Sequence, residues 1–292
     1  VRGQVRDASG NPIEFDGQAI VQAFDSDVLS LVEGNPWEQP GAPIFRSFAD
    51  VKDGAFQATF RVPKDISYRE SQGRISAYVT GDGVTTAHGS VRGIAFGGTQ
   101  EGVEPDNEGP MVTLAFEGQS EFRDGDFVPG RPMLQAPIED TGGINITGET
   151  VHEIELRIDD ELFKVTDFYT SLNGDYRTGV IEYPMPELEP GSHDVSLKVW
   201  DNFNNSSRAQ TTVQVAETDG SPLSSVIFHP NPMHDQGHFT YILTTPARSV
   251  RIKVFTLSGR LVDDMEGEGH PGYNQVAWEP PTALANGAYL YR

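Results

Sequence analysis

Residues 191–207, GSHDVSLKVWDNFNNSS, show most directly how this chain folds. In the first ten of them Val195, Leu197 and Val199 alternate with polar residues. A period of two residues predicts a β-strand with one buried face, because successive side chains of a strand point to opposite sides. The polar run DNFNNSS that follows is rich in turn-forming residues and predicts a tight connection to a further strand.

The same alternation recurs along the chain, with turn residues between the apolar runs. It is found in Phe56-Ala58-Phe60, Ile75-Ala77-Val79, Ile154-Leu156-Ile158 and Val213-Val215. Strands spaced in this way predict sandwiches of antiparallel sheets. We therefore predict an all-β chain with two Ig-like antiparallel β-sandwich domains, followed by a smaller, truncated β-sandwich domain.

Two polar stretches rich in turn residues divide the chain. They are residues 97–110, GGTQEGVEPDNEGP, and residues 217–225, ETDGSPLSS. A chain of 292 residues fits two or three domains of about 100 residues each. The predicted domains are 1–107, 108–217 and 218–292. The chain begins inside an apparent strand and ends on an unpaired one, so we expect it to be a fragment of a longer protein.

The charge balance excludes one class of partner. The chain has 43 acidic and 21 basic residues, which gives a formal net charge of −22. Such a surface repels phosphate backbones, so nucleic acid is not an expected partner. Two interpretations of the acidity stay open, a high-salt habitat that screens the charge and carboxylate sites for divalent cations, of which the first is simpler. No apolar run reaches the length of about 18 residues that a membrane-spanning helix needs.

The absence of cysteine excludes disulfides, thiolate zinc sites and a cysteine nucleophile within this chain. No G-x-S-x-G motif indicates a serine hydrolase either. His229, His234 and His238 have the spacing of metal ligands, but Pro230 and Pro232 would break a helix there, which favours ordinary loop and strand histidines. The sequence therefore predicts no catalytic residue and no zinc.

Calcium is the better candidate, because it binds several oxygen ligands from loops. Two segments are rich in carboxylate and amide oxygens. They are the loop 140–145, DTGGIN, and the turn 201–205, DNFNN. Asp106 and Glu108 form a further candidate. The alternative is that these residues only make the hydrogen bonds of turns. The predicted calcium ligands are Asp140, Asn145, Asp201, Asn202 and Asn204, and calcium is the only cofactor considered. The glycosylation sequons at Asn145, Asn204 and Asn205 are explained by turn chemistry.

The last third of the chain resembles a family of export domains. The motifs that carry the resemblance are His229-Pro230-Asn231-Pro232, Val250–Phe255, Ser258-Gly259-Arg260-Leu261-Val262, Gly272, Trp278 and Leu284–Tyr289. In this order they are similar to the C-terminal sorting domain of type IX secretion cargo in the Bacteroidetes and related phyla. Members normally continue with another strand pair, a lysine and a short apolar tail, so the domain is expected to be partial.

The first two-thirds of the chain contain a second set of motifs that carries a resemblance. They are Val5–Gly10, Phe15-Asp16-Gly17, Val62–Ile66, Gly97-Gly98, Asp106–Pro110, Asp140–Asn145, His152, Asp167-Phe168-Tyr169 and Trp200–Ser207. Together they resemble the region that follows the catalytic domain in the PorU family, which consists of gingipain-like cysteine peptidases that act as sortases of the type IX secretion system. The catalytic residues of such a peptidase would lie upstream of this chain, so none is assigned here.

The resemblance implies a non-catalytic accessory and docking region of a surface sortase. It would support an upstream cysteine peptidase domain of the same chain and anchor it at the outer membrane, with type IX outer-membrane components as protein partners. The implied location is extracellular, on the cell surface of a Bacteroidetes-type bacterium. One alternative is a secreted cargo exoenzyme whose terminal domain is a cleavable export signal. Another is a carbohydrate-binding or adhesin-type module with Trp37, Tyr68 and Tyr176 as its binding platform.

Overall fold

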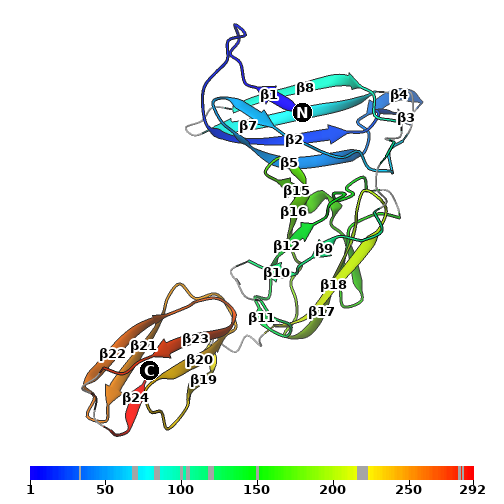
Figure 1. Ribbon diagram of the computed structural model, residues 1–292. Helices are drawn as coiled ribbons and strands as arrows, with labels where there is room; N and C mark the ends of the chain where they lie inside the picture. Colours follow the sequence, from blue (N-terminus) through cyan, green and yellow to red (C-terminus); the bar gives the residue numbers. More distant parts are fainter. Residues whose placement is uncertain are drawn as a thin grey trace. The chain divides into compact units, whose positions relative to one another are not determined.

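The computed structural model describes residues 1–32, 34–67, 72–81, 86–98, 101–102, 106–117, 122–148, 151–215, 223–281, 284 and 286–292. It confirms the predicted all-β fold, since the regular structure of these residues is strand apart from one 3-10 turn, η1 (Thr166–Phe168) (Figure 1). Within the described ranges, no helix is long and apolar enough to cross a membrane.

The chain forms two compact units. Unit 1 consists of residues 1–114, 135–183 and 196–210, and unit 2 consists of residues 115–134, 184–195 and 211–292. The domain limits at 107 and 217 stay predictions. Residues 99–100, 103–105 and 217–222, which belong to the two predicted linkers, lie outside the described residues.

The largest sheet has nine strands in the order β10-β12-β16-β15-β5-β2-β7-β8, with β9 paired to β12. Its strands are β2 (Gly17–Phe24), β5 (Pro43–Val51), β7 (Gly73–Gly81), β8 (Thr86–Ile94), β9 (Met111–Val112), β10 (Ala115–Phe116), β12 (Met133–Glu139), β15 (Tyr169–Leu172) and β16 (Asp175–Pro184). Most pairs are antiparallel, but β5 and β15 meet in parallel at Ser47 and Ser171. The alternation of single strands cannot predict such a pair, because its partners are distant in sequence.

Small side chains on one face of β2 and β5 allow a second layer to approach this sheet. Ala19, Val21 and Ala23 of β2 are fully buried. The second layer contains β1 (Arg2–Gln4) paired with β6 (Ala55–Gln57), followed by the segment that carries Ala58 and Ile66. A separate hairpin, β3 (Val28–Val32) and β4 (Asn35–Gln39), exposes Leu29, Leu31 and Trp37 to solvent.

A five-stranded sheet has the order β11-β18-β17-β13-β14. Its strands are β11 (Phe127–Val128), β13 (Glu155–Ile158), β14 (Glu161–Lys164), β17 (Gly191–Trp200) and β18 (Ser206–Val215). The burial predicted from Val195, Leu197 and Val199 is confirmed, since each is at most 1% exposed. The pair β11–β18 is parallel.

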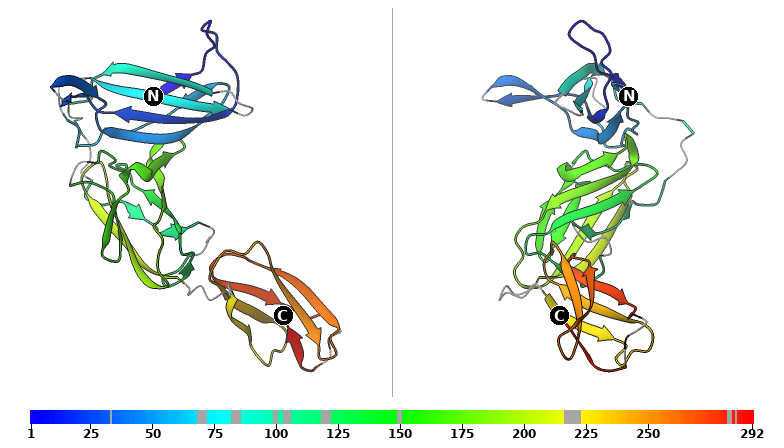
Figure 2. Two further views of the ribbon diagram at one scale, coloured as in Figure 1. Left: turned by 180° about the vertical axis from the view of Figure 1, so that it is seen from behind. Right: turned by 90° about the vertical axis from the view of Figure 1, so that its left-hand side faces the viewer.

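The terminal part of unit 2 is a small sandwich of two three-stranded sheets (Figure 2). One sheet orders β19 (Leu223–His229), β20 (Gly237–Leu243) and β23 (Gly272–Trp278), and the other orders β22 (Leu261–Gly267), β21 (Val250–Thr256) and β24 (Tyr289–Tyr291). Its core includes Phe239, Val254 and Trp278. The Trp278 indole donates a hydrogen bond to Asp263 Oδ2 at 2.9 Å, so the largest core side chain also has its polar group satisfied.

Candidate functional site

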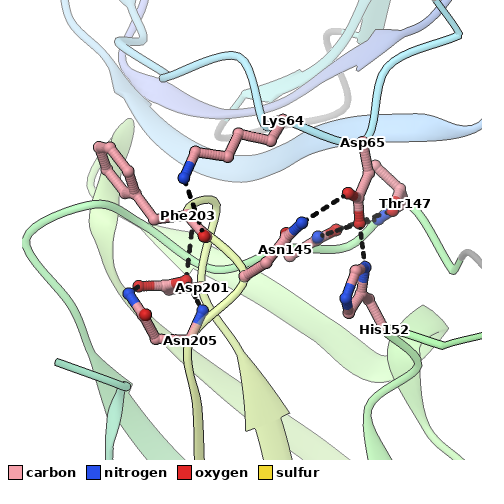
Figure 3. Close-up of polar contacts among 9 residues, drawn as sticks. Lys64, Asp65, Asn145, Thr147, His152, Asp201, Phe203 and Asn205 are labelled. Carbon is pink, nitrogen blue, oxygen red and sulfur yellow. Dashed lines mark hydrogen bonds and ion pairs between the residues drawn. The ribbon is translucent and has the colours of Figure 1, made fainter. Parts of the chain in front are cut away.

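Several motifs that carry the family resemblance lie together in unit 1 (Figure 3). They are the segment 62–66, the loop 140–145, His152 and the turn 201–205. The segment is held by Pro63 and Ile66, which are both buried and place the residues between them on the surface that faces the loops. These motifs are 80 to 139 residues apart in sequence where they bond, so tertiary folding brings them together.

Asp65 is the centre of a polar cluster that also contains Asn145, His152 and Asn204, here called the Asp65 cluster. Asp65 Oδ2 accepts a hydrogen bond from Asn145 Nδ2 at 2.8 Å and pairs with His152 Nδ1. Asp65 Oδ1 accepts from Asn204 Nδ2 at 2.9 Å. The side chains of His152 and Asp65 are only 18% and 13% exposed, so each depends on its partner for the contacts that it loses with water.

The surrounding contacts fix the orientation of these groups. Fully buried Asn145 accepts from the Thr147 N–H at 3.0 Å through Oδ1. This bond directs its Nδ2 donor at Asp65. The His152 ring packs edge-on against Trp200, with 4.6 Å between ring centroids.

Lys64 ties the same segment to the turn 201–205. Its backbone N–H donates to the Asn202 carbonyl at 3.1 Å, and its Nζ donates to the Phe203 carbonyl at 3.1 Å. The ammonium also lies 5.0 Å from the centre of the Phe203 ring, a cation–π distance. Together, Lys64 and the Asp65 cluster form a clasp between the segment 62–66 and the loops of the strands that follow, and we use that name below.

The chemistry of the clasp is that of a structural joint. An Asp–His pair is part of many hydrolase triads, but a triad also needs a nucleophile bonded to the second ring nitrogen. Within the described residues no hydroxyl is hydrogen-bonded to His152, and its ring contacts an indole instead. The sequence-based prediction that this chain has no catalytic residue stays a prediction.

Three carboxylates form a second polar group, the carboxylate cluster of Asp106, Asp140 and Asp201. One oxygen of each lies within 4.8 Å of the others. The buried Asp201 accepts the N–H groups of Phe203 and Asn205 at 2.9 and 2.6 Å. Asp140 and Asp106 likewise accept turn N–H groups, from Gly142 at 2.6 Å and Glu108 at 3.1 Å. The turns of this region therefore hold three acidic groups close together.

This arrangement changes the acidity of Asp140. Burial, together with the smaller effect of the negative charges of Asp201 and Asp106, raises the pKa of its carboxyl group from 3.8 to about 6, although the hydrogen bond from the Gly142 N–H acts in the opposite direction. A bound proton or a bound cation stabilises such a carboxyl group, because either one offsets its buried negative charge. The cluster is thus suited to either.

Calcium fits the spacing of these oxygens. Oxygen ligands lie about 2.3–2.6 Å from calcium, so two ligands on opposite sides of one ion are separated by about 5 Å. The buried Asn202 Oδ1 accepts no hydrogen bond from the described residues and leaves an unused oxygen on the same turn. The calcium site stays a prediction, which the structure allows us to restate for Asp106, Asp140 and Asp201.

The structure separates the residues that were predicted together as calcium ligands. Asp140 and Asp201 meet in the carboxylate cluster, joined by Asp106 from the other candidate pair. Asn145 and Asn204 instead donate to Asp65 in the clasp. The residue that sequence reasoning missed is Asp65: its motif was noted for the resemblance, but nothing in a V-P-K-D-I segment predicts where its carboxylate points.

The other candidate residues lie apart from both groups. His229 and His238 face each other across β19 and β20 with their rings stacked at 5.7 Å. In the described part of the chain, the carboxylate cluster is the only group of three or more histidine or acidic side chains close enough to share a metal. Trp37 is 61% exposed on β4, Tyr176 packs against the core of unit 1, and Tyr68 lies outside the described residues.

We expect Asp140→Asn to stabilise unit 1 at pH 7 to 8 in the presence of a chelator. A carboxyl whose pKa rises from 3.8 to about 6 on folding contributes full stability below pH 4, and this contribution is lost as the pH rises through 6. The neutral amide of asparagine avoids that loss. It should raise the free energy of unfolding at pH 8 by about 1 kcal/mol, a figure that allows for solvent screening at a partly exposed group. Thermal melts of both proteins at pH 4 and pH 8 test this. Equal melting differences at the two pH values would contradict it.

No family model and no curated protein matches this chain. A solved structure does match.

The chain is similar to PorU. The match is to the crystal structure of dimeric latent PorU from Porphyromonas gingivalis, with 29% sequence identity and a TM-score of 0.42. It covers 99% of this chain but 29% of the PorU chain. The present chain therefore spans less than a third of the length of that protein.

Proposed function

We propose that this chain is the non-catalytic accessory region of a PorU-like surface sortase of a type IX secretion system. In this proposal the sandwiches of unit 1 form a rigid support for an upstream cysteine peptidase domain, and the terminal sandwich docks the protein to outer-membrane components of the system. The protein then acts at the cell surface of a Bacteroidetes-type bacterium.

One observation carries the proposal. The motifs by which the sequence resembles the PorU family supply the clasp: Lys64 and Asp65, Asn145, His152, and the turn 201–205. A set of motifs that joins two parts of a support is what an accessory region requires. A cargo enzyme that uses its terminal domain only as an address has no need for this particular joint.

Gene deletion in the bacterium that makes this protein tests the proposal. We expect cargo proteins of the type IX system to retain their C-terminal sorting domains in the deletion strain, because the sortase that removes them is missing. The intact gene should restore cleavage. A gene carrying Asp65→Ala should restore it only in part, because the support is weakened. Mass spectrometry of secreted cargo measures the fraction that is cleaved.

Asp50→Ala is the matched control for this experiment, because Asp50 is an exposed aspartate on β5 of the same unit. It should restore cleavage fully. Normal cargo cleavage in the deletion strain would refute the sortase proposal. In that case the intact mass of the mature protein decides the cargo alternative, which requires that residues 218–292 be removed on export.

A further inference from the structure

The face of the large sheet at β7 and β8 is only partly covered. β8 is the last strand in the sheet order, and Val91 on β8 is 62% exposed although it lies opposite Ile75, a residue packed against the core. The strands of the layer over this face are β1 and β6, and β1 pairs with no other strand among the described residues. Among the described residues, no strand of this layer lies beyond β1 on the side of β8.

A groove of about 440 Å³ lies at this edge of the sheet. It is separate from a groove of about 540 Å³ in the terminal sandwich. Residues 1–6, Phe56 and residues of β7 and β8 line the groove at this edge. Its apolar floor includes Ile75, Ala77 and Val91. At Gly89 a Cβ atom would meet no heavy atom within 4 Å, so the groove is open above this residue.

The charge of the groove is opposite to that of the chain. Its lining residues include the basic residues Arg2 and Arg6 but no aspartate or glutamate. The whole chain, by contrast, has 43 acidic residues against 21 basic ones. A groove without carboxylates in so acidic a protein favours an acidic occupant, because the charges complement each other at the rim.

We propose that this groove binds an extended acidic segment of a partner protein, which adds as a β-strand beside β1 and completes the second layer over β8. The unpaired edge of β1 supplies backbone donors and acceptors for such a strand. Alternate side chains would point to the floor at Ile75 and Val91 and should be apolar. The side chains between them would face outward beside Arg2 and Arg6 and should be acidic.

Binding of a short peptide that alternates glutamate with valine tests this inference, with the full 292-residue chain and fluorescence anisotropy as the measurement. We expect saturable binding that weakens as salt is added, because the charge complementarity is screened. The matched peptide with lysine in place of glutamate should bind at least about tenfold more weakly, a difference of about 1.4 kcal/mol.

Three variants locate the binding. Gly89→Leu fills the groove without a clash, since nothing lies within 4 Å of the new Cβ. It should lower the affinity for the acidic peptide about tenfold or more. Gly97→Leu is its matched control, because Gly97 is equally open but outside the groove, and it should bind as the native chain does. Arg2→Glu should reduce the preference for the acidic peptide over the basic one.

Three results would overturn the proposal. The acidic peptide does not bind, or both peptides bind equally well, or Gly89→Leu binds as tightly as Gly97→Leu. Sedimentation of the chain alone identifies the other occupant: a dimer that Gly89→Leu dissociates would mean that a second copy fills the groove, and this too would contradict a partner segment.

Discussion

Asp65→Ala is expected to lower the free energy of unfolding of unit 1 by about 3 kcal/mol. The change removes the acceptor of two asparagine amides, at 2.8 and 2.9 Å, and the hydrogen-bond partner of His152. Asn145 is fully buried and cannot turn its amide to water. Removing one partner of a buried pair lowers the free energy of unfolding by more than the intact pair contributes to it. The reason is that the remaining partner stays buried without a hydrogen bond.

Urea unfolding followed by tryptophan fluorescence measures this effect, since Trp200 packs on the His152 ring. Asp50→Ala is again the control, and as a change at an exposed position it should stay within about 0.5 kcal/mol of the native chain. A double-mutant cycle with His152→Ala should show coupling of about 1 kcal/mol or more. A loss below about 1 kcal/mol for Asp65→Ala would show that the clasp does not hold unit 1 together.

Calcium is expected to raise the melting temperature of unit 1 by roughly 5 to 10 °C. At a free concentration of about 100 times the dissociation constant, a ligand that binds only the folded state adds about 2.7 kcal/mol. In a unit of about 150–250 residues, each kcal/mol raises the melting temperature by about 2–4 °C. The cause would be neutralisation of Asp106, Asp140 and Asp201, whose oxygens lie within 4.8 Å of one another.

Asp140→Asn separates calcium binding from simple screening. The variant removes one charged ligand but retains the oxygen that accepts the Gly142 N–H, so the turn should persist. It should lose most of the calcium response and keep the response to sodium chloride at the same ionic strength. Asp201→Ala is a poorer test, because Asp201 also accepts the N–H groups of Phe203 and Asn205. Magnesium, which dehydrates reluctantly, is a further control. If a chelator leaves the melting temperature unchanged, these carboxylates belong only to turns.

The individual strands could be predicted because burial follows a local pattern. Val195, Leu197 and Val199 alternate in sequence, and the structure buries all three. The parallel contact of β5 with β15 could not be predicted in this way. Its partners, Ser47 and Ser171, are 124 residues apart, and the serine hydroxyl that bonds across them has no signature in either strand.

The candidate site, too, could be predicted only in part from the sequence. The chain's own residue types already favoured oxygen-rich loops at 140–145 and 201–205, because aspartate, asparagine and glycine are both turn formers and hard-cation ligands. Which oxygens face one another was decided by tertiary structure. Asp106 joined Asp140 and Asp201, whereas Asn145 and Asn204 turned their amide donors to Asp65.

The sequence by itself therefore determined the all-β class, the faces of the strands and the acidic surface, since each depends on residue type and on spacing along the chain. The clasp and the groove beside β1 were decided only by tertiary structure. Both depend on backbone segments that approach across long sequence separations, such as Asp65 and Asn204, 139 residues apart. Local propensity carries no information about such an approach, because it arises from how the layers pack.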